Sequence, residues 1–213
     1  GAPKEATVSS GLARLTRPYV GWGVKFVDFD NDGALDLLIA NGHLHEQINM
    51  SNREVNYREP ILLLKNDGTG RFRRVEIPGS PILGRGLAAG DFDNDGFTDA
   101  IVMNLNDRPV LLHNSAASGQ SWLGIKLQGT RSNRDAIGAR LTLRSSNGTM
   151  TRWIVGGGSF LSSNDRRAVF GLGSLHEAGV LEILWPDQMK QTVSNLKLNS
   201  YTTITEPAGD GGK

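Results

Sequence analysis

Asp28-Phe-Asp-Asn-Asp-Gly-Ala-Leu-Asp36 and Asp91-Phe-Asp-Asn-Asp-Gly-Phe-Thr-Asp99 are two copies of one acidic motif. Each copy has carboxylates at positions 1, 3, 5 and 9 and a glycine at position 6. Carboxylates this close together repel one another unless a cation lies between them. Oxygen ligands suit a hard divalent ion such as Ca²⁺, and glycine at position 6 allows the sharp turn that directs the side chains inward. The motif therefore predicts two calcium sites.

The expected ligands are the aspartates and the main-chain carbonyl at position 7: Asp28, Asp30, Asp32, Ala34 and Asp36 in the first loop, and Asp91, Asp93, Asp95, Phe97 and Asp99 in the second. A metal-free turn is one alternative, but asparagine and glycine alone would make the turn. Catalytic carboxylates are another, but a glycosidase needs two carboxyls on either side of a bond rather than several around one centre. We therefore favour structural calcium.

The residues around each loop are those of strands. An EF-hand would have a bidentate glutamate at position 12 and a helix on each side. Position 12 is Ile39 in the first copy and Val102 in the second. The flanking segments 24–27 and 35–40 are apolar and partly β-branched, without helical periodicity. Each loop is therefore expected to join two strands.

The N-terminal part reads as two blades of β-propeller type, each with four strands. Residues 1–20 show little pattern, and a hairpin turn is expected at 66–70. The first blade is expected to contain strands at 23–28, 35–41, 61–65 and 71–77. The pattern then restarts, with strands at 86–91, 99–105 and 109–114.

The sequence pattern changes from about residue 122, and no further acidic motif occurs beyond that point. Short alternating segments separated by turns predict strands at 122–128, 139–144, 150–155, 168–172, 180–185, 191–198 and 201–205. The fold class is therefore all-β, with a blade domain over 1–118 and an antiparallel sandwich over 119–213. The boundary is expected in the small, polar segment 115–119.

These motifs resemble two known families. The acidic loops with their flanking strands resemble FG-GAP/VCBS repeats, the calcium-binding blades of integrin-type β-propellers. The C-terminal part is similar to the ASPIC/UnbV domain in four stretches, 129–140, 157–165, 170–173 and Trp185-Pro186. Proteins with both parts form the cartilage-acidic-protein-like (CRTAC-like) family. The resemblance implies a calcium-binding, secreted protein with more blades than two, of which this chain would be a C-terminal part.

Composition excludes several classes of function. The 213 residues carry a net charge of +1, which gives no electrostatic case for nucleic acid. There is no cysteine, so disulfides and thiolate metal sites are excluded. No apolar run approaches the roughly 20 residues that a membrane span needs. An extracellular or periplasmic location is expected.

The insertion 42–60 offers a different site. His43, His45, Glu46, Tyr57 and Glu59 could form a transition-metal or acid–base site, or be ordinary surface residues. Our leading hypothesis is a calcium-stabilised, non-enzymatic binding or adhesion module with a protein or carbohydrate ligand. The alternative is part of an enzyme acting on carbohydrate or in secondary metabolism, with its site on this loop.

Two further expectations concern polar clusters and assembly. After three glycines, Asn164 and Asp165 are expected to bond the backbone of a structured turn. Arg131, Arg134 and Arg140 could hold a carboxylate or sugar-acid ligand, or be strand-edge charges. The apolar strands at 35–40 and 61–64 require cover on both faces, which the C-terminal sandwich, a second copy of the chain or further blades could supply. Of these we expect self-association, as a homodimer, with the sandwich folding back as the alternative.

Overall fold

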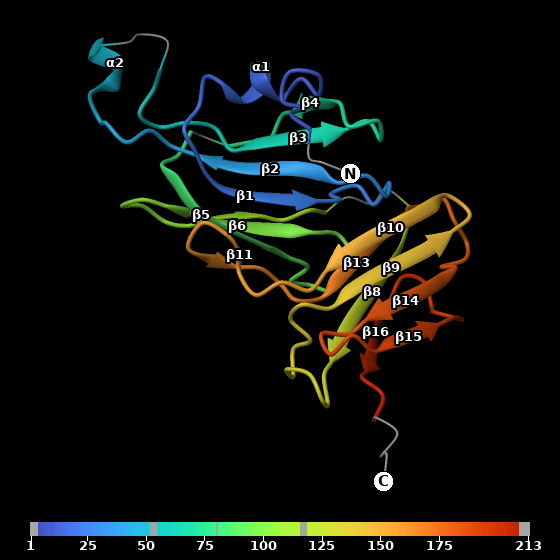
Figure 1. Ribbon diagram of the computed structural model, residues 1–213. Coiled ribbons are helices and arrows are strands. Elements are labelled where there is room, and N and C mark those ends of the chain that lie inside the picture. The colour runs from blue at the N-terminus through green and yellow to red at the C-terminus, as the bar shows by residue number, and fades with distance from the viewer. Residues whose placement is uncertain (1–3, 52–54, 80, 116–118, 209–213) are drawn as a thin grey trace.

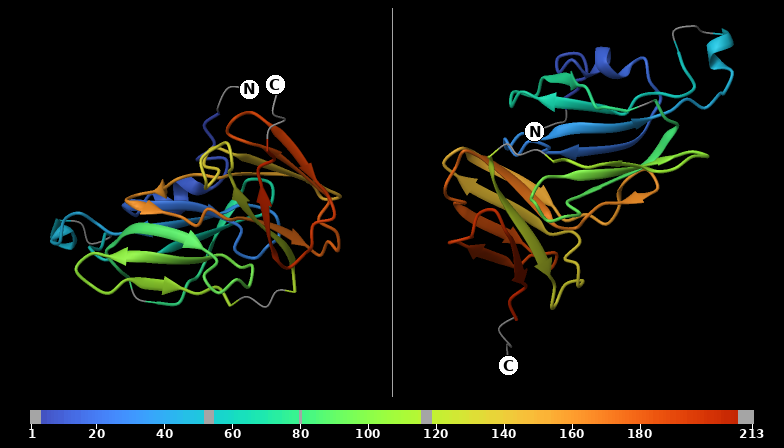
Figure 2. Two further views of the ribbon diagram at one scale, coloured as in Figure 1. Left: turned by 90° about the horizontal axis from the view of Figure 1, so that it is seen from below. Right: turned by 180° about the vertical axis from the view of Figure 1, so that it is seen from behind.

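The computed structural model describes residues 4–51, 55–79, 81–115 and 119–208, and these are mostly β-structure (Figure 1). They contain sixteen strands and two short helices, grouped into two N-terminal sheets, a C-terminal sandwich and a small hairpin. The all-β prediction is confirmed. The sandwich packs against one end of the two N-terminal sheets (Figure 2).

The first sheet is the predicted four-stranded meander. Its strands are antiparallel and follow chain order: β1 Gly21–Val27, β2 Asp36–Asn41, β3 Leu62–Asn66 and β4 Phe72–Val75. Every residue of β2 is buried, as its continuous apolar sequence indicates. The first acidic loop joins β1 to β2, so it connects two strands as expected.

Both faces of this sheet are covered within the chain. On one face, Leu12, Leu15 and Tyr19 pack against a cluster of Leu37, Ile39, Leu62 and Leu64. Leu12 and Leu15 belong to helix α1 (Leu12–Thr16), which the sequence did not predict. The other face packs against the second sheet through a shared apolar cluster of Val27, Leu38, Ala40, Ile82, Leu87, Ala89, Ala100 and Val102. The homodimer stays a prediction, but the apolar strands that motivated it do not need one.

The second sheet differs from the prediction of a four-stranded blade. It has three strands among the described residues, β5 Gly84–Gly90, β6 Asp99–Asn104 and β7 Val110–Leu112. The described residues 113–115 and 119–120 are in no strand, and the next strand, which begins at Ser121, belongs to the sandwich. The two sheets form no closed propeller within the part of the chain that the structure describes.

The C-terminal sandwich contains all seven strands that the sequence predicts. They are β8 Ser121–Gln128, β9 Arg140–Ser145, β10 Gly148–Trp153, β13 Ala168–Gly173, β14 Val180–Leu184, β15 Lys190–Val193 and β16 Tyr201–Thr205. Two sheets, β13-β8-β16 and β10-β9-β14-β15, enclose a separate core with Trp185 and Phe170 fully buried. The antiparallel expectation is wrong for one pair, because β16 runs parallel to β8. The segment 194–200 crosses from one sheet to the other before β16 begins.

A small hairpin, β11 Gly158–Ser159 and β12 Ser162–Ser163, extends from the sandwich toward the N-terminal sheets. The Phe160 ring packs edge-on against Trp22 of β1, with 5.0 Å between ring centroids. The expected boundary segment 115–119 includes residues 116–118, which lie outside the described residues.

Glu206 fastens the end of β16 to the loop that follows β8. Its buried carboxylate accepts hydrogen bonds from the backbone amides of Thr130, Arg131 and Ser132, each at 2.8 Å, and from the Ser132 hydroxyl at 2.7 Å. Burial works against the charged form, but these hydrogen bonds, that of the Ser132 hydroxyl foremost, lower the pKa of Glu206 to about 2. The carboxylate therefore stabilises the fold while it is ionised.

Glu206→Gln should reduce the free energy of unfolding by about 2–3 kcal/mol at neutral pH, because a neutral amide replaces an anion held by several donors. The folded pKa lies below the ordinary value of 4.5. The contribution is therefore complete above pH 4.5 and is lost as the pH falls toward 2. Urea unfolding across this pH range measures it. Glu177→Gln, at an exposed glutamate, is the control, and equal losses in the two variants would contradict the assignment.

Candidate metal centres at the domain interface

The two acidic loops have the same backbone conformation. The residues at position 4, Asn31 and Asn94, have φ of 56° and 64°, and the glycines at position 6, Gly33 and Gly96, have φ of 93° and 89°. Asparagine and glycine are the residues that enter this left-handed region most easily. The turn predicted from the glycine is confirmed. The asparagine at position 4 also favours this turn, because it too adopts the left-handed conformation.

The first aspartate of each loop closes the turn. Asp28 Oδ2 accepts a hydrogen bond from the Gly33 amide at 3.0 Å, and Asp91 Oδ2 accepts one from the Gly96 amide at 2.8 Å. Both aspartates are buried. Each loop is therefore held in shape by the buried carboxylate of its first residue.

The ninth position of each loop ties it to the third strand of its sheet. Asp36 accepts hydrogen bonds from the amides of Phe29 and Asn66, and Asp99 accepts the equivalent bonds from Phe92 and Asn114, at 2.7–3.2 Å. Both oxygens of each carboxylate thus already have a backbone donor. Either oxygen keeps a free lone pair for a metal ion, so the ligand roles of Asp36 and Asp99 stay predictions.

The structure brings most of the predicted carboxylate ligands together. Oxygens of Asp28, Asp30 and Asp32 lie within 4.8 Å of one another, as do those of Asp91, Asp93 and Asp99. Asp95 belongs to a third, exposed group with Asp93 and His113. The carbonyl groups of Ala34 and Phe97 stay predicted ligands.

The first loop contains buried oxygens that lack a hydrogen-bond partner. They are Oδ1 of Asp28, Oδ1 of Asp30 and Oδ1 of Asn31. Burial raises the pKa of Asp28 to about 7, against the attraction of Arg152, and burial also raises the pKa of Asp36 to about 6. Unpaired buried anions are strongly unfavourable. A divalent cation would satisfy these oxygens, so the donor set fits Ca²⁺.

A basic side chain lies beside each loop, which the sequence analysis missed. Lys65 pairs with Asp30 and, at 3.2 Å, with Asp32, and His113 Nε2 lies 3.0 Å from Asp93. Lys65 and His113 occupy equivalent positions, because each lies directly before an asparagine: Asn66 at the end of β3, or Asn114 just after β7. This repeated pattern in the sequence could have indicated the two side chains that pair with the acidic loops. The Lys65 ammonium partly compensates the first acidic group, and His113 provides a hydrogen-bond partner for the second.

The two loops contact each other as well as their own sheets. Asn31 Nδ2 donates to the Gly96 carbonyl at 3.1 Å, and Asn114 Nδ2 donates to the Phe29 carbonyl at 2.6 Å. The Asn31 carbonyl in turn accepts a bond from the Gly173 amide of the sandwich at 2.8 Å. The loops thus lie where the first sheet, the second sheet and the β13-β8-β16 sheet of the sandwich meet.

The second loop binds the sandwich through aromatic and basic side chains. The Tyr201 hydroxyl donates to Asp91 Oδ2 at 2.6 Å, and burial together with this bond raises the pKa of Tyr201. Arg167 lies over the Tyr201 ring at 4.2 Å and bonds the Asp91 carbonyl and the Asn94 side chain. The Trp122 ring covers Gly96 so closely that a Cβ there would collide with it.

The first loop meets the sandwich at Arg152 and Gly171. Arg152 Nη2 lies 3.9 Å from Asp28 Oδ2, and a Cβ on Gly171 would collide with Asp28 and Asn31. The side chain of Arg152 is 15% exposed. The interface thus places an arginine opposite the buried carboxylate of the first loop.

The expected turn after the three glycines also joins the two parts. Asn164 Nδ2 donates to the Gly157 carbonyl at 2.8 Å, as expected of a side chain that bonds the backbone. Its Oδ1 accepts from the Ala89 amide at 2.9 Å, and the Asp165 amide donates to the Ala89 carbonyl at 2.9 Å. This segment therefore pairs with strand β5.

The insertion 42–60 contains the short helix α2 (Ile48–Ser51), and its residues 52–54 lie outside the described residues. Glu59 is buried and accepts a hydrogen bond from the Val20 amide at 2.9 Å. Burial raises the pKa of Glu59, while His43 and Arg85 oppose the shift. His45 and Glu46 are exposed. Glu59 is thus buried near His43, whereas His45 and Glu46 are exposed to solvent.

Comparison with known proteins supports the C-terminal assignment. Residues 129–211 match the family model described as ASPIC and UnbV. The chain is 29% identical over 189 residues to cartilage acidic protein 1 of Mus musculus and of Homo sapiens. It is also 29% identical over 194 residues to cartilage acidic protein 1 of Xenopus tropicalis. The alignments cover 84–86% of this chain but only 27–28% of each relative.

The chain thus carries an ASPIC and UnbV domain and is a distant relative of cartilage acidic protein 1, as its motifs suggested. It spans less than a third of the length of these relatives. Within the described residues, no helix is long and apolar enough to cross a membrane.

Gly96→Ala should destabilise the protein by about 2 kcal/mol more than Gly68→Ala, as judged by urea unfolding. The two glycines have similar positive φ values, 89° and 81°, so the backbone strain of alanine is shared. Only Gly96 faces the Trp122 ring, whereas nothing lies within 4 Å of a Cβ at Gly68. Equal losses in the two variants would contradict close packing between the second loop and the sandwich.

Proposed function

We propose that this chain, an ASPIC and UnbV domain protein distantly related to cartilage acidic protein 1, is a calcium-binding, non-enzymatic binding or adhesion module. Each acidic loop binds one Ca²⁺ ion. The blades are of the FG-GAP/VCBS type, and the ligand is a protein or a carbohydrate. The protein acts outside the cell or in the periplasm, in keeping with relatives named for cartilage, an extracellular tissue.

One observation carries the calcium proposal. In the first loop, Asp28 and Asp30 each have a buried oxygen without a hydrogen-bond partner, and both belong to a group of carboxylates within 4.8 Å. A cation would satisfy such oxygens, because a buried carboxylate oxygen without a hydrogen-bond donor is unfavourable. The second loop has the same backbone and the same motif, so the proposal extends to it.

Calcium fits this donor set better than magnesium does. Ca²⁺ accepts a variable number of carboxylate and carbonyl oxygens in flexible geometry. Mg²⁺ demands a near-ideal octahedron, keeps several waters and is usually held by one or two carboxylates. The predicted ligand set, with four aspartates and a carbonyl in each loop, matches the first description.

Bound calcium would hold the two parts of the chain together. Asp28 faces Arg152 and Asp91 accepts from Tyr201, and both partners belong to the sandwich. An ion in each loop would fix the carboxylates that these residues contact. A non-enzymatic role accords with carboxylates that surround single centres, and with the exposure of His45 and Glu46 away from buried Glu59.

Metal-stripped protein should bind about two Ca²⁺ ions per chain in a calorimetric titration. At a free calcium concentration 100 times Kd, each site would stabilise the folded state by about 2.7 kcal/mol. Chelation should therefore lower the melting temperature by several degrees or more, since a loss of that size is a large fraction of a typical domain stability.

Asp30→Asn should remove one of the two sites and about half of the calcium-dependent rise in melting temperature. Asp107→Asn removes an exposed carboxylate outside the loops and should bind calcium as the unaltered protein does. The proposal fails if metal-stripped protein takes up no calcium, or if its melting temperature is the same in chelator and in calcium.

A further inference from the structure

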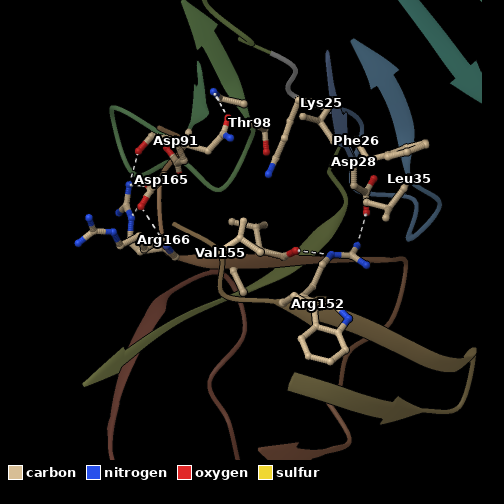
Figure 3. A pocket seen from close by; sticks show the side chains of 18 of the residues that line it. Lys25, Phe26, Asp28, Leu35, Asp91, Thr98, Arg152, Val155, Asp165 and Arg166 are labelled. Atoms are coloured by element: carbon tan, nitrogen blue, oxygen red, sulfur yellow. Dashed lines mark hydrogen bonds and ion pairs between the residues drawn. The ribbon is translucent and has the colours of Figure 1, made fainter. Parts of the chain in front are cut away.

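A cavity of about 280 Å³ lies between the N-terminal sheets and the sandwich (Figure 3). Strands β1 and β5 and the first residue of each acidic loop form one wall, and residues of β10, β13 and the segment before β13 form the other. Ligand sites often lie at domain interfaces of this kind. The volume is just below the usual range for drug-sized ligands, roughly 300–1,000 Å³. The cavity therefore suits a small ligand with about one ring.

Two cationic groups in this cavity have no hydrogen-bonded acidic partner among the residues that the structure describes. Lys25 reaches into the space between the Asp91 side and the Asp28 side of the cavity (Figure 3). No ion pair joins it to a described carboxylate, and burial lowers its pKa. Arg152 donates through Nε and Nη1 to backbone carbonyls, whereas its buried Nη2 has no hydrogen-bond partner.

The other charged groups of the cavity already have partners. Arg167 pairs with Asp165 at 2.7 Å, and Arg166 pairs with Asp135. Asp91 accepts hydrogen bonds from Tyr201 and Gly96. Asp28 lies 3.9 Å from Arg152, which is beyond hydrogen-bonding distance, and it is a predicted calcium ligand. Asp28 Oδ1 also lacks a hydrogen-bond partner, but it is assigned to the proposed calcium ion. With Asp28 so assigned, the charge left in the cavity without a close partner is positive.

Apolar side chains complete the lining. Val27, Ala89 and Val155 give the cavity an apolar lining, and Val155 is also partly exposed. Apolar side chains beside cations without a hydrogen-bonded acidic partner provide a surface for the body of a ligand and donors for its charge.

We propose that this cavity binds a small organic carboxylate of about one ring, such as a sugar acid or an aryl acid, whose carboxylate accepts hydrogen bonds from Lys25 and Arg152. The ligand contacts both parts of the chain and lies against Val27 and Val155. This assignment names the ligand class for the binding module proposed above and rests on that role. Arg131, Arg134 and Arg140, which the sequence singled out for a carboxylate, do not line this cavity.

Calorimetric titration with D-glucuronate and with benzoate tests the assignment, with calcium present in excess. Glucose and benzamide serve as uncharged counterparts. We expect at least one of the two acids to bind, its neutral counterpart to bind at least about tenfold more weakly, and the affinity to fall as ionic strength rises. Binding of glucuronate alone identifies a sugar acid, and binding of benzoate alone identifies an aryl acid. Binding of neither acid overturns the proposal.

Lys25→Met removes one cation and keeps a side chain of similar length, so it should weaken binding of the acid about tenfold or more. Lys126→Met removes an exposed lysine of β8 outside the cavity and should bind as the unaltered protein does. Arg152→Met should act like Lys25→Met. Should that variant not fold, because Asp28 then loses its cation, Lys25→Met decides the matter. Equal affinity in Lys25→Met and Lys126→Met overturns the proposal.

Calcium uptake, measured in the same variants, separates this assignment from the calcium proposal. Lys25→Met should take up calcium as the unaltered protein does, because Lys25 is not in either loop. Calcium uptake without acid binding would leave the metal sites standing and remove the carboxylate site. Acid binding that depends on Lys25, in protein that takes up no calcium, would do the reverse.

Discussion

The burial of Asp28 and Asp91 is the constraint on which the rest of this structure depends. Each is the first residue of an acidic loop, and each closes its turn by accepting the amide of a glycine. A buried carboxylate must be compensated by donors or cations. Asp91 finds Tyr201, whereas Asp28 has only Arg152 at 3.9 Å and keeps an unpaired oxygen. The loops are thus built around charge that the protein groups alone do not balance.

The same loops explain how two parts with separate cores stay together. The apolar cluster of the sandwich contains only residues from 123–204, and those of the N-terminal sheets contain none from beyond residue 112. Hydrophobic burial therefore stabilises each part but contributes less to their junction. The junction includes close packing at Gly96 and Gly171, where no Cβ would fit, and polar contacts from Arg167 and Tyr201. Its geometry depends on the conformation of the loops.

Local pattern predicted most of the strands and the turn at each glycine, because period-2 alternation and left-handed backbone are encoded within a few residues. It missed helix α1, whose five residues carry too little periodicity. It also missed the truncation of the second sheet and the parallel pairing of β16, which depend on where the chain crosses between sheets. The sequence predicted only part of the candidate site. The aspartates stand in one motif, but Tyr201 lies 110 positions from Asp91, and no local signal links such residues.

Arg152 links the two proposed sites at the junction, because it faces Asp28 of the first calcium site and lines the carboxylate cavity. While the first loop lacks a metal, Asp28 attracts Arg152 and supplies negative charge to the cavity wall. A cation bound to Asp28 would offset that charge and leave Arg152 Nη2 and Lys25 to attract an anion. Coupling between two sites is reciprocal, so a bound carboxylate would strengthen the binding of the metal by the same factor. The physical origin is electrostatic attraction across the shared wall. A cation bound in the acidic loop attracts an anion to the basic cavity, and an anion in the cavity attracts a cation to the loop.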